Sequence, residues 1–274
     1  MSFDKEYKRV IEMCLKGALR PTRDISAFSV PGVTIRHDMS LGFPATTLRK
    51  LPFRSVSVET DFYLKGLTDK RWLEDRGCNF WKYWNSPTSD DKNDLGPIYG
   101  FEWRNWGLDY ENKSDKSKSI DQLNNLIKEI KNNPESKRLV VSQWNPTNIK
   151  HCAIPPCPFA FQILKYGNKL NMVFYQRSVD VCLGLPNDFA QHALLLQLIC
   201  NETNYEAGEV IGMFGQAELY QNHRENAEKL LKRDVQQYPK LLLSKKVHLN
   251  NFNYTDVQLN NYTTGEKLFF KISV

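Results

Sequence analysis

Residues 159–200 decide the fold, and they read FAFQILKYGNKLNMVFYQRSVDVCLGLPNDFAQHALLLQLIC. Two strand-like runs, 159–166 and 170–178, are joined by a Gly-Asn pair typical of a tight β-hairpin turn. The run 189–200 is apolar nearly all round, which predicts a helix that is buried on every side. A hairpin followed by a buried helix indicates a sheet packed against helices.

The rest of the chain adds further helices and strands around this centre. The spacing of apolar residues predicts helices over 5–16, 53–65 and 120–134, and strands over 138–144, 209–215 and 267–274, with a strand over 28–39 interrupted at Pro31 and Gly32. Polar stretches predict loops over 85–97 and 107–118, the second a variable insertion. We therefore expect one α+β domain over residues 1–274, with a mostly antiparallel sheet and helices packed on one side.

The composition favours a protein that handles small anions. The 37 basic and 31 acidic residues give a net charge of +6, but the cations are spread along the chain and form no stripe for nucleic acid. There is no apolar run long enough to cross a membrane, and the charged N-terminus does not look like a signal peptide. The six cysteines lack paired spacing, so we expect reduced thiols, a cytoplasmic location and no metal. We expect neither nucleic acid nor a membrane as a partner.

Cys157 is the first candidate for chemistry, and it lies between prolines in AIPPCPFAF. Free cysteines are most often buried and inert. A backbone fixed by proline on both sides also makes a rigid mount for a nucleophile, which nearby cations would activate. Its position alone leaves both interpretations open.

Three arginines and one aspartate also have two interpretations each. Arg23, Arg138 and Arg177 are either solvated surface residues or, with Ser178, the donors of a phosphate pocket. Asp188 precedes the buried helix, where it is either a plain N-cap or a carboxylate that reads a ligand.

Five sequence blocks narrow these alternatives. They are DLGPIYGFEWRNW, NPESKRLVVSQWNP, IPPCPFAFQ, YQRSVDVCLGLPND and LYQNH, and they occur in this order. Together they resemble the thymidylate synthase family over nearly the whole chain. The resemblance implies a homodimeric α+β fold with one sheet face at the dimer interface. It also implies transfer of one carbon from 5,10-methylenetetrahydrofolate to C5 of a pyrimidine nucleotide.

The resemblance assigns roles residue by residue. Catalytic roles fall to Cys157 as the nucleophile that adds to C6, to Glu59 for water and proton transfers, and to Tyr99 for the proton network near C5. Substrate roles fall to Arg23, Arg177 and Ser178 at the phosphate, Tyr220 at the sugar, and Lys137 and Arg138 at the partner's phosphate site. Folate roles fall to Trp81, Asp180, Gly184 and Val274, with Asp180 accepting from the pterin and Val274 closing over the folate.

Asp188 departs from the family pattern, because thymidylate-making members have an asparagine at this position. An amide offers a donor and an acceptor, which fit N3–H and O4 of uracil. A carboxylate offers only acceptors, which suit the N4 amine and a protonated N3 of cytosine. Relatives that act on cytidylate carry the same change, and they add water to the exocyclic methylene group. Their products are a 5-hydroxymethyl nucleotide and tetrahydrofolate.

Further departures concern the base and the sugar. Pro158 replaces the histidine that usually follows the nucleophile, and DISAFS replaces a glycine- and threonine-rich turn after Arg23. Glu218 replaces a histidine near Tyr220, and Lys137 replaces an arginine. A carboxylate at position 218 suits a ribose diol, although the residue could also be exposed at the start of a helix. Glu218 and Lys137 together tilt the prediction slightly toward CMP over dCMP.

Three functions follow from the sequence. The first is a CMP or dCMP 5-hydroxymethylase, in which Asp188 both contacts the base and assists catalysis. The second is reductive methylation of dUMP or dCMP of the thymidylate synthase type, which yields dihydrofolate and is favoured by Trp81 and Val274. The third is a non-catalytic relative that binds nucleic acid, for which only the basic charge argues.

Overall fold

The fold is seen in a computed structural model that describes residues 1–111, 118–244 and 246–272. Its main sheet has the strand order β1-β2-β7-β5-β4-β3, and β6 also pairs with β7. The strands are β1 (Ala18–Arg20), β2 (Ala27–Asp38), β3 (Val140–Ser142), β4 (Pro158–Tyr166), β5 (Lys169–Gln176), β6 (Val179–Asp180) and β7 (Glu206–Tyr220). Among the described residues, the parallel pairs of this sheet are those of β5 and β6 with β7, and its other pairs are antiparallel. The predicted mixed α+β fold with a mostly antiparallel sheet is confirmed.

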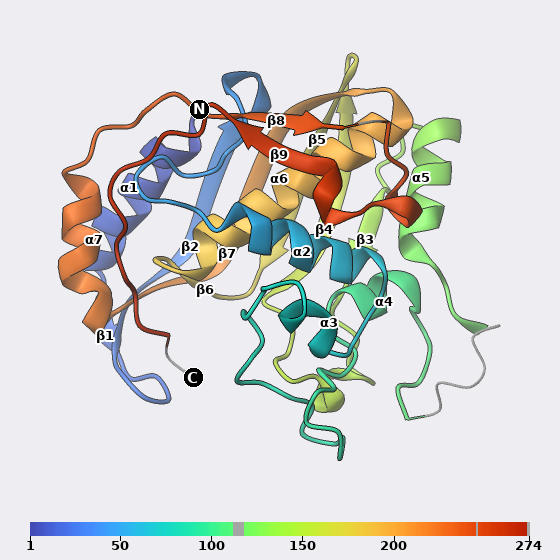
Figure 1. Ribbon diagram of the computed structural model, residues 1–274, viewed down its shortest axis with the longest axis horizontal. Coiled ribbons are helices and arrows are strands. Elements are labelled where there is room, and N and C mark those ends of the chain that lie inside the picture. The colour runs from blue at the N-terminus through green and yellow to red at the C-terminus, as the bar shows by residue number, and fades with distance from the viewer. Residues whose placement is uncertain (112–117, 245, 273–274) are drawn as a thin grey trace.

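The hairpin and the buried helix predicted from residues 159–200 form the centre of the molecule. The β4–β5 turn contains Gly167 at φ +60°, a left-handed conformation that glycine adopts without strain. The chain then passes through α6 (Gly184–Thr203) and returns as β7 beside β5. A parallel pair requires such a crossover. Helix α6 packs against the sheet and also against α2 (Phe53–Leu64), as Figure 1 shows, so its apolar residues are buried on all sides.

The other predicted helices are confirmed with small shifts at their ends. They are α1 (Phe3–Leu15), α2 and α5 (Gln122–Asn132), and the side chain of Asp121 caps α5 by accepting from the Asn124 amide. Elements that the sequence analysis missed are α3 (Arg71–Glu74), α4 (Gly100–Arg104), α7 (Arg224–Leu231), strand β1 and a separate two-stranded sheet of β8 (Lys240–Leu243) and β9 (Val257–Asn260). Most of these elements are short, so they carry little periodicity. Within the described ranges, no helix is long and apolar enough to span a membrane.

The predicted interruption of the strand at Pro31 and Gly32 is wrong. Strand β2 runs through both residues, and Pro31 pairs with Gln216 of β7. On its other side, β2 pairs with β1 only up to Ser29. Pro31 therefore lies where one edge of the strand has no partner, and a residue without an N–H is tolerated there.

The predicted C-terminal strand is also wrong for residues 267–272, which form no strand, and residues 273–274 lie outside the described part. Two of this segment's carbonyls accept hydrogen bonds from side chains of His223 and Asn226. Of the predicted loops, 85–97 has no helix or strand, whereas 107–118 is described only at residues 107–111 and 118.

Candidate functional site

Two adjoining hollows lie where the N-terminal end of α6 meets β5, β6 and β7. The side chains that line the inner hollow include Glu59, Trp81, Tyr99, Gln176, Asp180, Asn187, Asp188 and Ile272, and Gly184 also borders it. The outer hollow is lined by residues that include Arg23, Arg177, Glu218 and Tyr220. Cys157 and Ser178 line both hollows. The tertiary structure therefore gathers side chains from distant segments around one thiol.

Cys157 lies just before β4, at the junction of the hollows. The Arg177 guanidinium donates from Nη2 to the Cys157 Sγ at 3.5 Å, and the carbonyls of Pro155 and Pro156 accept from the same guanidinium at 2.9 and 3.1 Å. Burial raises the pKa of the Cys157 thiol, and the Arg177 charge opposes this rise. The thiol is half-buried, whereas the other free cysteines are buried. Cys157 is therefore less enclosed than the other cysteines, and it lies beside a cation, which is a setting that a nucleophilic thiolate requires.

Tyr99 and Glu59 lie on the wall of the inner hollow. The Tyr99 hydroxyl accepts from the Cys157 amide at 3.2 Å, and burial raises the pKa of Tyr99 well above its usual range. Tyr99 has φ +24°, a strained value for a residue with a Cβ and one that clusters at functional sites. Glu59 accepts from Trp81 Nε1 at 2.6 Å and from Gln191 Nε2 at 2.9 Å. Burial raises the pKa of Glu59, so it can hold a proton more readily than a solvated glutamate.

Asp188 is not a helix cap. Helix α6 already begins at Gly184, with Leu183 as its N-cap, so Asp188 lies in the second turn. Its Oδ2 accepts from Gln176 Nε2 at 2.7 Å on the wall of the inner hollow. The pKa of Asp188 is raised to about 7, mainly by burial; the Gln176 hydrogen bond opposes the rise, and the charges of Glu59 and Asp180 add to it. At neutral pH this carboxyl group can therefore act as a donor or as an acceptor.

The residues matched to folate binding lie around the same inner hollow. Asp180 Oδ1 accepts from the amides of Cys182 and Leu183 at 2.8 and 3.1 Å, so this carboxylate, and not Asp188, serves the start of α6. Burial raises the pKa of Asp180, and His223 opposes the rise. Trp81 is 7% exposed. Gly184 leaves ordinary space, because an added Cβ would lie 3.5 Å from Asp188 Oδ2.

The outer hollow carries the charges matched to phosphate and sugar. Arg23 and Arg177 are exposed, and the Ser178 hydroxyl accepts from Arg177 Nη1 at 3.2 Å. Glu218 lies on β7 and is half-buried, so its interpretation as an exposed residue at a helix start is wrong. Its Oε1 accepts from Gln216 Nε2 at 2.7 Å. Burial raises the pKa of Tyr220 to about 12, so its hydroxyl stays protonated.

Two predicted residues lie away from the hollows, and one lies outside the described residues. Lys137 and Arg138 are exposed just before β3, and Arg138 borders a separate groove beside α5. Within one chain, this pair therefore does not meet the other phosphate candidates. Val274 falls in the part of the chain that is not described.

Sequence reasoning missed several residues of the site. Gln176, Gln191, Asn187 and Trp84 either line the hollows or bond to residues that do. Strand alternation offered one signal, since Gln176 and Ser178 are two residues apart and share the inner hollow. No local pattern marked Gln191, because it lies within a helix that is apolar nearly all round.

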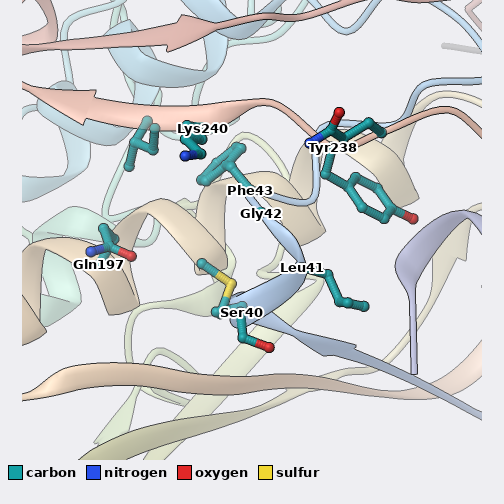
Figure 2. Close-up of a pocket in the computed structure, with 10 residues that line it drawn as sticks. Ser40, Leu41, Gly42, Phe43, Gln197, Tyr238 and Lys240 are labelled. Carbon is teal, nitrogen blue, oxygen red and sulfur yellow. The ribbon is translucent and has the colours of Figure 1, made fainter.

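A further pocket lies elsewhere on the molecule, as Figure 2 shows. Its walls come from the turn after β2, from Gln197 of α6 and from the start of β8, and Lys240 is the one charged residue among those that line it. It contains none of the residues predicted for catalysis. Among the described residues, no group of three or more His, Cys, Asp or Glu side chains could hold a metal ion.

Comparison with protein families agrees with this geometry. The family model for thymidylate synthase matches residues 5–274, which is nearly the whole chain. Members of that family are homodimers that transfer a one-carbon unit from folate to a pyrimidine nucleotide. With this match and a half-buried cysteine beside an arginine in a cleft of the expected fold, the chain belongs to the thymidylate synthase family.

Proposed function

We propose that this enzyme adds a hydroxymethyl group to C5 of a cytidine monophosphate, with CMP favoured slightly over dCMP. The reaction consumes 5,10-methylenetetrahydrofolate and water, and it releases tetrahydrofolate and the 5-hydroxymethyl nucleotide. The observation that carries the proposal is the Asp188 carboxyl group on the wall of the inner hollow, with a pKa raised to about 7.

Asp188 suits cytosine in either of two equivalent states. A protonated carboxyl group donates to N3 and accepts from the N4 amine, and a carboxylate accepts from both once N3 carries the proton. The pair holds one proton in each state, and a pKa near 7 makes that proton available at neutral pH. Gln176 donates to Oδ2, which leaves Oδ1 as the oxygen that is free to share the proton. Uracil offers N3–H and O4, so it would lack a donor opposite O4 unless Asp188 were protonated.

Cys157 is proposed as the nucleophile. Its sulfur adds to C6, and the electron pair of the C5–C6 double bond moves to C5, which becomes the carbon nucleophile. Arg177 at 3.5 Å from the sulfur favours the thiolate. A proton on N3, held by Asp188, withdraws electrons from the ring and assists the addition. Tyr99 and Glu59 are proposed to move protons and orient water at C5 and its substituent.

The inner hollow also fits a flat, polar heterocycle such as the pterin of the folate. Its walls include Phe80, Trp81, Trp84 and Leu183 as apolar surfaces. Among the described residues, the Asn187 Oδ1 is buried without a hydrogen-bond partner, so it can accept from a ligand. Asp180 is proposed to accept from the pterin. When bound, the folate supplies the one-carbon unit.

The sugar preference rests on Glu218 and Lys137. Gln216 fixes one oxygen of Glu218 and leaves the other for a ribose diol beside Tyr220. The 2′-hydroxyl of ribose gives this carboxylate a hydrogen-bond donor, and deoxyribose lacks that donor. Lys137 and Arg138 are proposed to reach the phosphate site of the partner subunit, where Lys137 is a weaker clamp than arginine.

The second candidate is reductive methylation of dUMP or dCMP with release of dihydrofolate. Trp81 favours it, because this buried indole bonds to Glu59 and helps to close the inner hollow to water. Hydride transfer is protected where water is excluded, whereas hydroxymethylation needs a water molecule beside the one-carbon unit.

One experiment separates the two candidates. The protein is incubated with 5,10-methylenetetrahydrofolate and an equimolar mixture of CMP, dCMP and dUMP, and the products are identified by mass spectrometry. We expect 5-hydroxymethylcytidine monophosphate as the main product, with no rise in dihydrofolate absorbance. A methylated nucleotide accompanied by dihydrofolate would establish the second candidate instead.

A further inference from the structure

The C-terminal strap, residues 265–272, is held to the body of the protein by side chains. Figure 1 shows it descending beside α7, and Ile272 at its end lines the inner hollow. Three side chains in or next to α7 each donate to one strap carbonyl: His223 Nε2 to Lys271 at 2.7 Å, Asn226 Nδ2 to Phe269 at 2.8 Å and Arg233 Nη1 to Glu266 at 2.6 Å. The strap is therefore attached in part through its main-chain carbonyls.

Phe270 is the buried anchor of the strap, and it is 5% exposed. The Arg49 guanidinium lies 5.4 Å from the centre of its ring, and the His223 ring meets it edge-on at 5.2 Å. Arg49 also donates to the Cys182 carbonyl at 2.5 Å, in the turn that leads into α6. Phe270 thus packs against two residues that adjoin the wall of the inner hollow.

His223 is the residue that touches both the strap and that wall. Its Nε2 faces the Lys271 carbonyl, which can only accept, so Nε2 must carry a proton. Its Nδ1 is buried without a hydrogen-bond partner among the described residues, and it lies 3.8 Å from Asp180 Oδ1. A ring lone pair and a carboxylate repel each other at this distance, whereas a proton between them makes the contact attractive.

We propose that His223 is a positioning residue that joins the C-terminal strap to Asp180, so that a folate heterocycle meets the strap and the Asp180 carboxylate in a fixed relation. This inference rests on the proposed folate site. Because His223 takes up the Oδ1 side of Asp180 together with the Cys182 and Leu183 amides, it leaves Oδ2 for the ligand. The His223 imidazole therefore positions both Asp180 on the wall of the inner hollow and the strap whose Ile272 lines it.

The strap contact is tested on the free protein, without nucleotide or folate. The glutamine amide of His223→Gln reaches the Nε2 position, whereas the shorter amide of His223→Asn reaches only the Nδ1 position. We expect trypsin to cleave after Lys267 about tenfold faster in His223→Asn and within about twofold of the wild-type rate in His223→Gln. An unchanged cleavage rate in His223→Asn would overturn the proposal.

The Asp180 contact is tested with a matched variant, Asn226→Ala, which also loosens the strap but does not approach Asp180. Tetrahydrofolate binding is followed by quenching of tryptophan fluorescence, since Trp81 and Trp84 line the hollow. We expect His223→Gln, which keeps the Nε2 contact to the strap but loses the Nδ1 group facing Asp180, to weaken binding about tenfold more than Asn226→Ala. Equal losses of affinity in the two variants would show that His223 acts through the strap alone and would overturn the link to Asp180.

A spectroscopic measurement covers the case in which the variants fail to fold. In wild-type protein labelled with nitrogen-15 at histidine, we expect the His223 Nε2 resonance of a protonated nitrogen. An unprotonated Nε2 would overturn the proposal. The cleavage rates and this spectrum need no substrate, so they would stand even if CMP gave no product and the proposed function failed.

Discussion

The inner and outer hollows hold their charges in opposite ways. The inner hollow surrounds its carboxyl groups with neutral donors, such as Gln176 beside Asp188 and Gln191 beside Glu59. The outer hollow presents exposed arginines whose charge is already in contact with water. Burial therefore raises the pKa values of the carboxyl groups in the inner hollow, whereas the exposed arginines of the outer hollow stay positively charged.

This difference suits the two hollows to different parts of a nucleotide. A half-buried carboxyl group with a pKa near 7 responds strongly to one proton or one amine on a ligand. Exposed guanidinium groups bind a phosphate without regard to the base, and salt screens them. Recognition of the base should thus depend on the inner hollow, and capture of the nucleotide should depend on the outer one.

The largest effect is expected where the two hollows meet. Cys157→Ser should lower kcat by on the order of 10⁴-fold or more, because a hydroxyl group is a far weaker nucleophile than a thiolate. Binding of CMP, measured by calorimetry, should change little, since both hollows keep their charges. Cys152→Ala is the control, because this buried thiol lies outside the hollows. A Cys157→Ser enzyme with near wild-type kcat would rule out covalent catalysis.

The next effect concerns the inner hollow alone. Asp188→Asn should raise the ratio of activity on uridylate to activity on cytidylate by on the order of 10³-fold, because an amide pairs with N3–H and O4. The ratio of kcat/KM values for dUMP and dCMP measures this change. Asp91→Asn, which alters an exposed aspartate away from the cleft, should leave the ratio as it is. If Asp188→Asn leaves it unchanged too, Asp188 does not read the base.

A smaller effect is expected in the outer hollow. Arg23→Ala should raise KM for CMP and dCMP alike by about tenfold, with little change in kcat, because it removes a charged contact to phosphate. The increase should shrink at high salt, where the contact is already screened. Arg54→Ala, which removes another exposed arginine, serves as the control. A selective loss for one base would contradict the division between the hollows.

The smallest effect concerns stability. Asp188 ionises at about pH 7 in the folded protein and near 3.8 when unfolded, so it favours folding below pH 3.8 and loses that contribution as the pH rises to about 7. Asp188→Asn avoids this loss. Its Tm should therefore exceed that of the wild type by about 3–6 °C at pH 8, and by less at pH 5. Scanning calorimetry at both pH values tests this, and a larger gain at pH 5 would contradict the raised pKa.

The sequence predicted the elements whose signals are local. The β4–β5 turn follows from its Gly-Asn pair, and α5 follows from its apolar spacing. The errors arose where the context was distant. Pro31 was predicted to interrupt its strand. The strand tolerates this proline because β1 stops pairing with β2 at Ser29, which the sequence does not show. Residues 267–272 were predicted as a strand. Two of their carbonyls instead accept from side chains more than 40 residues earlier in the sequence, and no local pattern indicates such contacts.

In the candidate site too, some residues could be placed from the sequence and others only from the fold. Arg177 and Ser178 stand next to each other in the sequence, so their common location was predictable from one motif. The sequence alone could not show whether Asp188 caps the helix. In the structure α6 begins at Gly184, and Asp180 accepts from the amides just before it, so Asp188 has no capping role.

Local patterns were enough to predict the order of the main helices and strands and the chemical types of the side chains in the cleft, because periodicity and turn chemistry act over a few residues. How those side chains act on one another depends on where the fold places them. The fold brought Gln176 from β5 and Glu59 from α2 to Asp188 on α6, and it buried these groups partly or fully. A carboxyl group's affinity for a proton depends on its burial and its neighbours in space, and neither is written in the order of the residues.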